Sequence, residues 1–181
     1  MGEVFKIVVT GPFNSGKTTF IGAISEIEVV STERMTRGSF GEKARTTVAM
    51  DFGRISLPHG SVIHMYGTPG QSRFDFMWEV LSEGMLGYVV LLDGSDSSTF
   101  EEGRRIIETF TNMCGAPFVV GITRADKQEC IDMGSMREKL TPWGDMEVLE
   151  CDARRREDVK SVLLSLLELV MERAEAAEPV G

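Results

Sequence analysis

The sequence predicts an α/β fold in which helices flank a mostly parallel central sheet. Two observations support this prediction: short apolar runs rich in β-branched residues recur along the chain, and stretches of helical period separate most of them. Alternation of this kind is typical of a sheet covered by helices on both faces. Six runs are predicted to be strands: 4–10, 47–57, 61–67, 87–93, 116–123 and 146–152.

The clearest helical patterns lie at 100–113 and 156–177. In the second pattern, apolar side chains fall on one stripe, formed by Val159, Val162, Leu163, Leu166, Leu167 and Val170. The strands at 47–57 and 61–67 depart from the parallel arrangement, because residues 57–61 are too few for anything but an antiparallel hairpin. The sheet is therefore predicted to be mixed, with one antiparallel strand among six.

Length and charge limit the possible classes of function. A chain of 181 residues fits one domain over 1–181, with a disordered tail expected at 177–181. Its 42% apolar content is enough for a sizeable core. The formal net charge is −9, and the densest basic cluster, 154–156, is too short to follow a nucleic-acid backbone. We therefore expect no nucleic-acid partner.

The cysteines and the two ends of the chain favour a cytoplasmic protein. Cys114, Cys130 and Cys151 lack the spacing of a metal site, and their odd number suits a reducing compartment. No segment is apolar enough to span a bilayer, and no signal peptide precedes the run VFKIVVT. The start MGEVFK lacks a myristoylation signal and the end EPVG lacks a prenylation cysteine. We therefore expect no direct membrane anchor.

The stretch GPFNSGKT, residues 11–18, matches a phosphate-binding loop placed between the first strand and the first helix. Gly11 and Gly16 let the backbone turn so that its N–H groups face the phosphate oxygens. The start of the helix adds a positive dipole end. Lys17 supplies a cation to the terminal phosphates, and the Thr18 hydroxyl is a magnesium ligand. The loop residues assigned to nucleotide binding are Gly11, Asn14, Ser15, Gly16, Lys17, Thr18 and Thr19.

Four stretches follow this loop in a fixed order: KARTTVAMDF, GTPGQSRF, GITRAD and CDAR. With the loop, they make the chain resemble the Ras-like small GTPases, in particular their bacterial and archaeal relatives in polarity and motility switches. The resemblance covers nearly the whole chain. It implies a P-loop NTPase fold of the Ras-like kind, a six-stranded mixed sheet flanked by helices, and GTP or GDP with Mg²⁺ as ligands.

The resemblance also implies roles for residues around the γ-phosphate. Thr47 would sense the metal and the phosphate through its hydroxyl and carbonyl, with the neighbouring Thr46 as the alternative. The Gly70 N–H would contact the γ-phosphate, and Gln71 would orient the attacking water. Arg45 is a candidate arginine supplied in cis, with a solvated loop charge as the alternative.

On the base side, Asp126 would accept hydrogen bonds from N1–H and the exocyclic amine of guanine. Thr123 and Arg124 replace the Asn and Lys of the family pattern, and the Arg124 stem can lie along a face of the base. In the last stretch Asp152 replaces Ser and can brace its loop, while the Ala153 N–H would contact the guanine O6. These substitutions leave guanine preference less secure than nucleotide binding.

Gly67 stands where the family has an aspartate that helps to hold magnesium. If the hairpin loop is the three-residue segment 58–60, Asp51 lies directly opposite Gly67, and its carboxylate has room to cross the empty side-chain position. A two-residue loop would turn Asp51 to the other face. We interpret Asp51 as a replacement metal contact, with a solvated strand charge as the alternative. Asp93, at the end of the run VVLLD, is a rival carboxylate.

The predicted function is a GTP/GDP molecular switch with slow intrinsic hydrolysis, because Phe13 crowds the place where Gln71 must act. Segments 31–47 and 67–80 would change partner affinity on hydrolysis. The resemblance suggests an effector and a regulator, such as a Roadblock-type dimer. Four apolar side chains could form the partner surface or pack on the sheet: Phe74, Phe76, Met77 and Trp78. The alternatives are a non-hydrolysing nucleotide-binding scaffold and an ATP-using P-loop enzyme.

Overall fold

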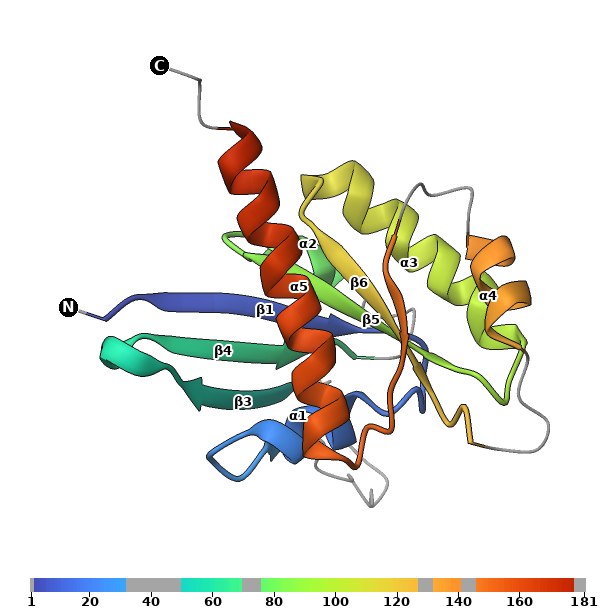
Figure 1. Ribbon diagram of the computed structural model, residues 1–181, viewed down its shortest axis with the longest axis horizontal. Coiled ribbons are helices and arrows are strands. Elements are labelled where there is room, and N and C mark those ends of the chain that lie inside the picture. Colours follow the sequence, from blue (N-terminus) through green and yellow to red (C-terminus); the bar gives the residue numbers. More distant parts are fainter. Residues whose placement is uncertain (1, 32–49, 70–75, 127–131, 141–145, 178–181) are drawn as a thin grey trace, which may run out of the picture.

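The computed structural model describes residues 2–31, 50–69, 76–126, 132–140 and 146–177. In these residues seven strands form one sheet in the order β2-β3-β4-β1-β5-β6-β7 (Figure 1). The strands are β1 Val4–Thr10, β2 Val30–Ser31, β3 Asp51–Ser56, β4 Val62–Gly67, β5 Gly87–Asp93, β6 Phe118–Thr123 and β7 Val148–Glu150. The helices are α1 Lys17–Ile24, α2 Phe76–Ser82, α3 Ser98–Cys114, α4 Met133–Leu140 and α5 Arg156–Ala177. A single 3-10 turn, η1 Pro58–Gly60, joins β3 to β4.

The six predicted strands are all present, and the two-residue β2 adds a short seventh strand at the edge of the sheet. β3 pairs antiparallel with both β2 and β4, while every other pair is parallel. The prediction of a mixed sheet with one antiparallel strand is therefore confirmed. Of the predicted strand 47–57, the positions 47–49 lie outside the described residues. Of the predicted disordered tail 177–181, Ala177 is instead the last residue of α5, and 178–181 lie outside the described residues.

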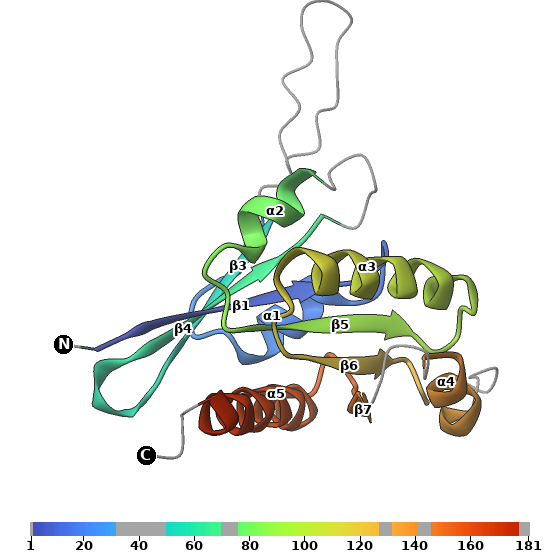
Figure 2. The same ribbon diagram turned by 90° about the horizontal axis from the view of Figure 1, so that it is seen from above.

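Helices cover both faces of the sheet (Figure 2), and an apolar layer is buried on each side. On one face, α1 and α5 pack against residues such as Ile7 and Val9 of β1. On the other face, α2, α3 and α4 pack around Val8 of the same strand. Neighbouring residues of β1 therefore serve opposite layers, as the two-residue period of a strand requires. The stripe predicted on the last helix is buried at Val159, Val162, Leu163 and Leu166.

The topology brings the carboxyl ends of the parallel strands to one edge of the sheet. β1 ends at Thr10, β4 at Gly67, β5 at Asp93 and β6 at Thr123, and the strands that carry them are neighbours in the sheet. Ligands of open α/β sheets bind at this edge, because the loops that follow the strands meet there. The predicted nucleotide residues are thus collected from distant parts of the sequence.

Close packing between β3 and α1 depends on Gly53. A Cβ atom at this position would lie 2.4 Å from Cγ2 of Ile21 and 3.2 Å from Cβ of Ser25. Ile21 is completely buried, so it has little room to move. We expect Gly53→Ala to lower the free energy of unfolding by roughly 1–3 kcal/mol through overpacking.

The measurement is urea unfolding followed by circular dichroism, with Arg54→Ala as the control on the exposed side of the same strand. The control should change the stability by less than about 0.5 kcal/mol. Equal stability of Gly53→Ala and the unsubstituted protein would contradict the close packing of α1 on β3.

Candidate functional site

The loop between β1 and α1 has the conformation that phosphate binding needs. Gly11 has a φ of 143° and Gly16 a φ of 98°, both in the region that favours glycine. A Cβ atom on Gly11 would lie 2.2 Å from the carbonyl oxygen of Leu91, so the start of the loop lies close against the backbone of β5. Gly16 then begins α1, and its carbonyl accepts a hydrogen bond from the Phe20 N–H at 2.8 Å.

Lys17 is the buried cation of this loop. Its Nζ donates to the carbonyl oxygens of Gly11 and Pro12, at 2.8 and 2.6 Å, and lies 3.4 Å from the hydroxyl of Ser15. Burial lowers the pKa of Lys17 to about 8, although the negative charge of Asp51 opposes this shift. An ammonium group in this position supplies positive charge where phosphate oxygens would approach the loop.

Asp51 occupies the position that the three-residue hairpin loop predicts. It is paired with Gly67, and the pairs Phe52–Tyr66 and Ile55–Ile63 follow in the same register. The Asp51 carboxylate is buried beside the phosphate loop, where Oδ2 accepts a hydrogen bond from the Thr18 hydroxyl at 2.5 Å. The predicted register is confirmed. Asp51 is buried, so the alternative prediction of a solvated strand charge is wrong.

Asp93 has other partners. Its Oδ1 accepts hydrogen bonds from the Ser95 N–H and hydroxyl, at 3.0 and 2.6 Å, and its Oδ2 pairs with the Arg124 guanidinium. Burial would raise the pKa of Asp93, but the hydrogen bonds from Ser95 and Arg124 outweigh burial and lower it. Asp93 thus orders the turn after β5 and anchors Arg124.

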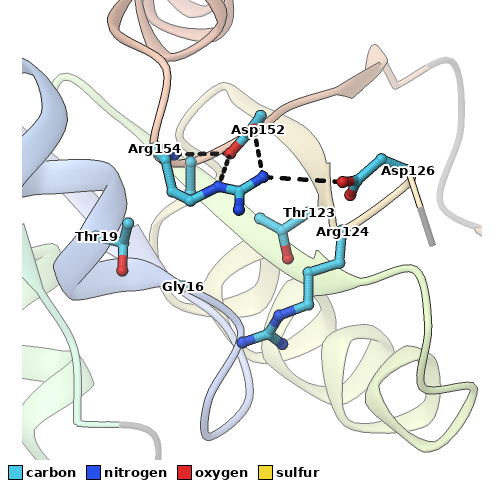
Figure 3. Close-up of a pocket in the computed structure, with 8 residues that line it drawn as sticks. Gly16, Thr19, Thr123, Arg124, Asp126, Asp152 and Arg154 are labelled. Atoms are coloured by element: carbon cyan, nitrogen blue, oxygen red, sulfur yellow. Dashed lines mark hydrogen bonds and ion pairs between the residues drawn. The ribbon is translucent and has the colours of Figure 1, made fainter.

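Thr123 and Arg124 fasten the phosphate loop to the end of β6. The buried Thr123 hydroxyl lies 3.0 Å from the Ser15 carbonyl oxygen and 3.1 Å from that of Leu92. Arg124, with a left-handed φ of 55°, donates to the Asn14 carbonyl oxygen at 3.0 Å. Its guanidinium turns toward Asn14 and Asp93, away from Asp126 (Figure 3). The substituted positions of this motif therefore stabilise the loop.

A cleft of about 200 Å³ lies beside the start of α1 (Figure 3). Its lining residues are Gly16, Thr19, Thr123, Arg124, Asp126, Asp152, Ala153 and Arg154. All but one of them were predicted from the sequence as nucleotide-binding residues. The exception is Arg154, which the sequence could have indicated because it takes the basic third place of the Ser-Ala-Lys pattern that CDAR resembles.

Arg154 is the main cation on the base side of the cleft. Its Nε and Nη2 donate to the two carboxylate oxygens of Asp152, at 2.8 and 2.7 Å. These hydrogen bonds hold the pKa of Asp152 down at about 2. The same Nη2 lies 3.8 Å from Oδ2 of Asp126, so one guanidinium is shared by two carboxylates (Figure 3). The Asp126 side chain is largely exposed.

Several predicted residues lie outside the described part of the chain: Arg45, Thr46, Thr47, Gly70, Gln71 and Phe74. Phe13 is described, and its side chain is 65% exposed on the phosphate loop. Trp78 of α2 is buried and stacks on Phe110 of α3, with the ring centroids 5.6 Å apart. The apolar side chains of this segment were predicted either to form a partner surface or to pack on the sheet. Trp78 packs in the core.

These features define a nucleotide-binding P-loop protein with a Ras-like fold. A glycine-rich loop with its lysine and threonine, a mixed sheet and a cleft at the carboxyl edge occur together in that class. The profile of a family described as "conserved hypothetical ATP binding protein" matches residues 28–176, and the chain belongs to this family. The matched span begins after the phosphate loop and includes the base-side residues.

Comparison with individual proteins places the chain in the Ras-like P-loop GTPase superfamily. It is 21% identical over 170 residues to ADP-ribosylation factor-like protein 3 of Saccharomyces cerevisiae, covering 89% of this chain and 83% of the relative. It is 24% identical over 176 residues to the Ras-related protein SEC4 of Candida albicans, covering 94% and 79%. An uncharacterized protein of Methanocaldococcus jannaschii is 36% identical over 98 residues, which span 54% of this chain and 56% of that relative.

Among the described helices, none combines the length and apolar composition that a bilayer-spanning segment needs.

Thr123→Val tests the attachment of the phosphate loop. The substitution keeps the size of the side chain but removes the hydroxyl that bridges Ser15 and Leu92. We expect the free energy of unfolding to fall by roughly 1–3 kcal/mol, since buried carbonyl oxygens lose a donor. Urea unfolding measures the loss, and Thr123→Ser, which keeps the hydroxyl, should recover most of it. A stable Thr123→Val protein would mean that the bridge is unimportant.

The lowered pKa of Lys17 predicts two pH effects of opposite sign, one on stability and one on nucleotide affinity. Its pKa is lowered to about 8, so the unfolded chain binds more protons than the folded chain between about 8 and the ordinary value of 10.5. The contribution of Lys17 to the free energy of unfolding therefore rises with pH in this window. Nucleotide affinity should fall as pH rises through about 8, because the folded protein loses the cation that meets the phosphates.

Fluorescence titration with a nucleoside diphosphate and urea unfolding across this pH range would measure both effects. Lys17→Met serves as the control, since it should lack both dependences. Affinity that is independent of pH in the unsubstituted protein would contradict the role of the Lys17 charge.

Proposed function

We propose that the protein is a GTP/GDP molecular switch with slow intrinsic hydrolysis. The observation that most supports this proposal is the presence of Asp126 and the Asp152–Ala153 loop in the same cleft as Gly16 of the phosphate loop. A carboxylate in that place can accept hydrogen bonds from the N1–H and the exocyclic amine of guanine. Adenine presents no such pair of donors on the corresponding edge, so Asp126 favours guanine.

Each part of the nucleotide has a proposed set of partners. Gly11, Asn14, Ser15, Gly16 and Thr19 surround the phosphates together with the Lys17 ammonium, while Asp126, Asp152 and Ala153 meet the base. The Arg124 stem would lie along a face of the base, whereas its guanidinium and the Thr123 hydroxyl brace the phosphate loop. Thr18 and Thr47 are proposed magnesium ligands. When bound, magnesium neutralises part of the phosphate charge. Gly70 and Gln71 would face the γ-phosphate and the attacking water, with Arg45 as the candidate cis arginine.

Slow turnover is proposed from the phosphate loop itself. Phe13 exposes a large apolar side chain on the loop. We propose that it crowds the place where Gln71 and an incoming arginine side chain must meet. Crowding there hinders the alignment of the attacking water by Gln71. We expect an unassisted rate on the order of 10⁻⁴ to 10⁻² s⁻¹, as in switches of this kind.

The switch would act through segments 31–47 and 67–80, whose order depends on the γ-phosphate and magnesium in proteins of this type. We propose that an effector and a regulator, such as a Roadblock-type dimer, bind these segments. The net charge of −9 argues against a nucleic-acid partner. The proposed setting is the cytoplasm.

A second candidate is an ATP-binding function, which the family description favours. The base side of the cleft is open, since Asp126 is largely exposed, and Thr123 stands where the GTPase pattern has asparagine. A third candidate is a scaffold that binds nucleotide without hydrolysing it. Multiple-turnover release of phosphate from GTP separates the switch from the scaffold.

The deciding experiment measures the affinity of the protein for fluorescently labelled GDP and for fluorescently labelled ADP, each in magnesium and in chelator. We expect GDP to bind at least about tenfold more tightly than ADP, since a charge-assisted hydrogen bond contributes roughly 1.5–3 kcal/mol. Asp126→Asn should weaken GDP binding by roughly 10- to 100-fold. It should also favour xanthosine diphosphate, whose second carbonyl accepts from the new amide.

Glu150→Gln is the matched control, because it removes one negative charge from the neighbouring surface without touching the base cleft. It should leave both affinities unchanged. Equal binding of GDP and ADP by the unsubstituted protein would instead favour the ATP-binding candidate.

A further inference from the structure

The side-chain space at the end of β4 is already filled by a residue of β3. A Cβ atom on Gly67 would lie 3.0 Å from Cβ of Asp51, 3.3 Å from its Oδ2 and 3.0 Å from Cδ1 of Ile21. These distances are shorter than ordinary van der Waals contacts between such atoms. A carboxylate at position 67 and the carboxylate of Asp51 therefore exclude each other.

Asp51 is a buried carboxylate whose hydrogen bond comes from a neutral group. It is 9% exposed and bonds to the Thr18 hydroxyl at 2.5 Å. No ion pair involving Asp51 is present among the described residues, although its negative charge acts on Lys17 and raises the pKa of that residue. Buried charges are normally paired or bound to a metal. The surroundings of Asp51 therefore suit an additional cation.

We propose that Asp51 is the carboxylate of a magnesium site built with Thr18, and that it replaces the side chain absent at Gly67. This inference rests on the proposed nucleotide function. A hydroxyl has one proton and two lone pairs, so Thr18 can donate to Asp51 and still offer a lone pair to a cation. Magnesium commonly takes one or two carboxylates, phosphate oxygens and several waters.

The other carboxylate at this edge of the sheet is already engaged. Asp93 is held by Ser95 and by the Arg124 guanidinium, so its charge is compensated within the protein. The described residues contain no group of three or more acidic, histidine or cysteine side chains that could hold a metal. The site assigned to Asp51 is therefore one completed by the nucleotide phosphates.

The test measures how much magnesium slows the release of fluorescent GDP, or of ADP if the protein binds that nucleotide instead. Release is compared in excess magnesium and in chelator for three variants: Asp51→Asn, Gly67→Asp, and Asp51→Gly combined with Gly67→Asp. The affinity for Mn²⁺, read from its electron paramagnetic resonance signal with the nucleotide bound, is a second readout that does not depend on hydrolysis.

Asp51→Asn should lose roughly 10- to 100-fold of the metal effect, which is the ratio of the release rates in chelator and in magnesium, and of the Mn²⁺ affinity. The double variant returns one carboxylate to the site from β4 and should recover most of both. Gly67→Asp alone crowds two carboxylates together and should be less stable. Thermal unfolding of each variant shows that the protein is folded, and Asp96→Asn, on the exposed turn before α3, is the carboxylate control.

An unchanged metal effect in Asp51→Asn would overturn this inference while leaving the proposed nucleotide function intact. The absence of any metal effect in the unsubstituted protein would also overturn it. If neither GDP nor ADP binds, the proposed nucleotide function fails, and this magnesium site fails with it, because the nucleotide phosphates complete the site.

Discussion

The structure of the site depends on one buried cation, the ammonium group of Lys17. The carbonyl oxygens of Gly11 and Pro12 hold it under a loop that only glycine can turn at positions 11 and 16. The start of the loop lies close against the backbone of β5, where a side chain at position 11 would collide with the carbonyl oxygen of Leu91. Asp51 adds the opposing charge from the neighbouring hairpin. The phosphate side of the cleft is therefore held in place before a ligand arrives.

The base side is built differently. Thr123 and Arg124 are directed toward the phosphate loop, where they brace Ser15 and Asn14. The groups that remain to meet a base are exposed, and a single guanidinium, that of Arg154, is shared between Asp152 and Asp126. Exposed charge pairs contribute little to stability, so they are easily rearranged by a ligand. In the proposed function, the phosphate loop and its buried contacts hold the nucleotide, and the exposed side chains of the cleft select the base.

The hairpin of β3 and β4 brings a carboxylate to the phosphate loop. Its register places Asp51 opposite Gly67, and the missing side chain at 67 admits the carboxylate toward Thr18. The Ras-like pattern has an aspartate where this chain has Gly67 in β4, and the space of that side chain is filled by Asp51 of the neighbouring strand β3. β3 begins shortly after the proposed switch segment 31–47. The proposed metal contact Asp51 is therefore close to that segment in the sequence.

The sequence by itself determined the α/β fold and the phosphate loop, and it reduced the hairpin register to two alternatives, of which the three-residue loop is the one present. These features follow from local rules: glycine permits left-handed turns, strands have a period of two, and a three-residue loop allows one pairing. Only the tertiary structure decided the directions of side chains at the carboxyl edge. Arg124 turns to Asn14 and Asp93, Arg154 enters the cleft, and Trp78 is buried on Phe110. Each of these outcomes depends on neighbours that lie far away in the sequence, and pairing between strands and loops, not local preference, brings them together.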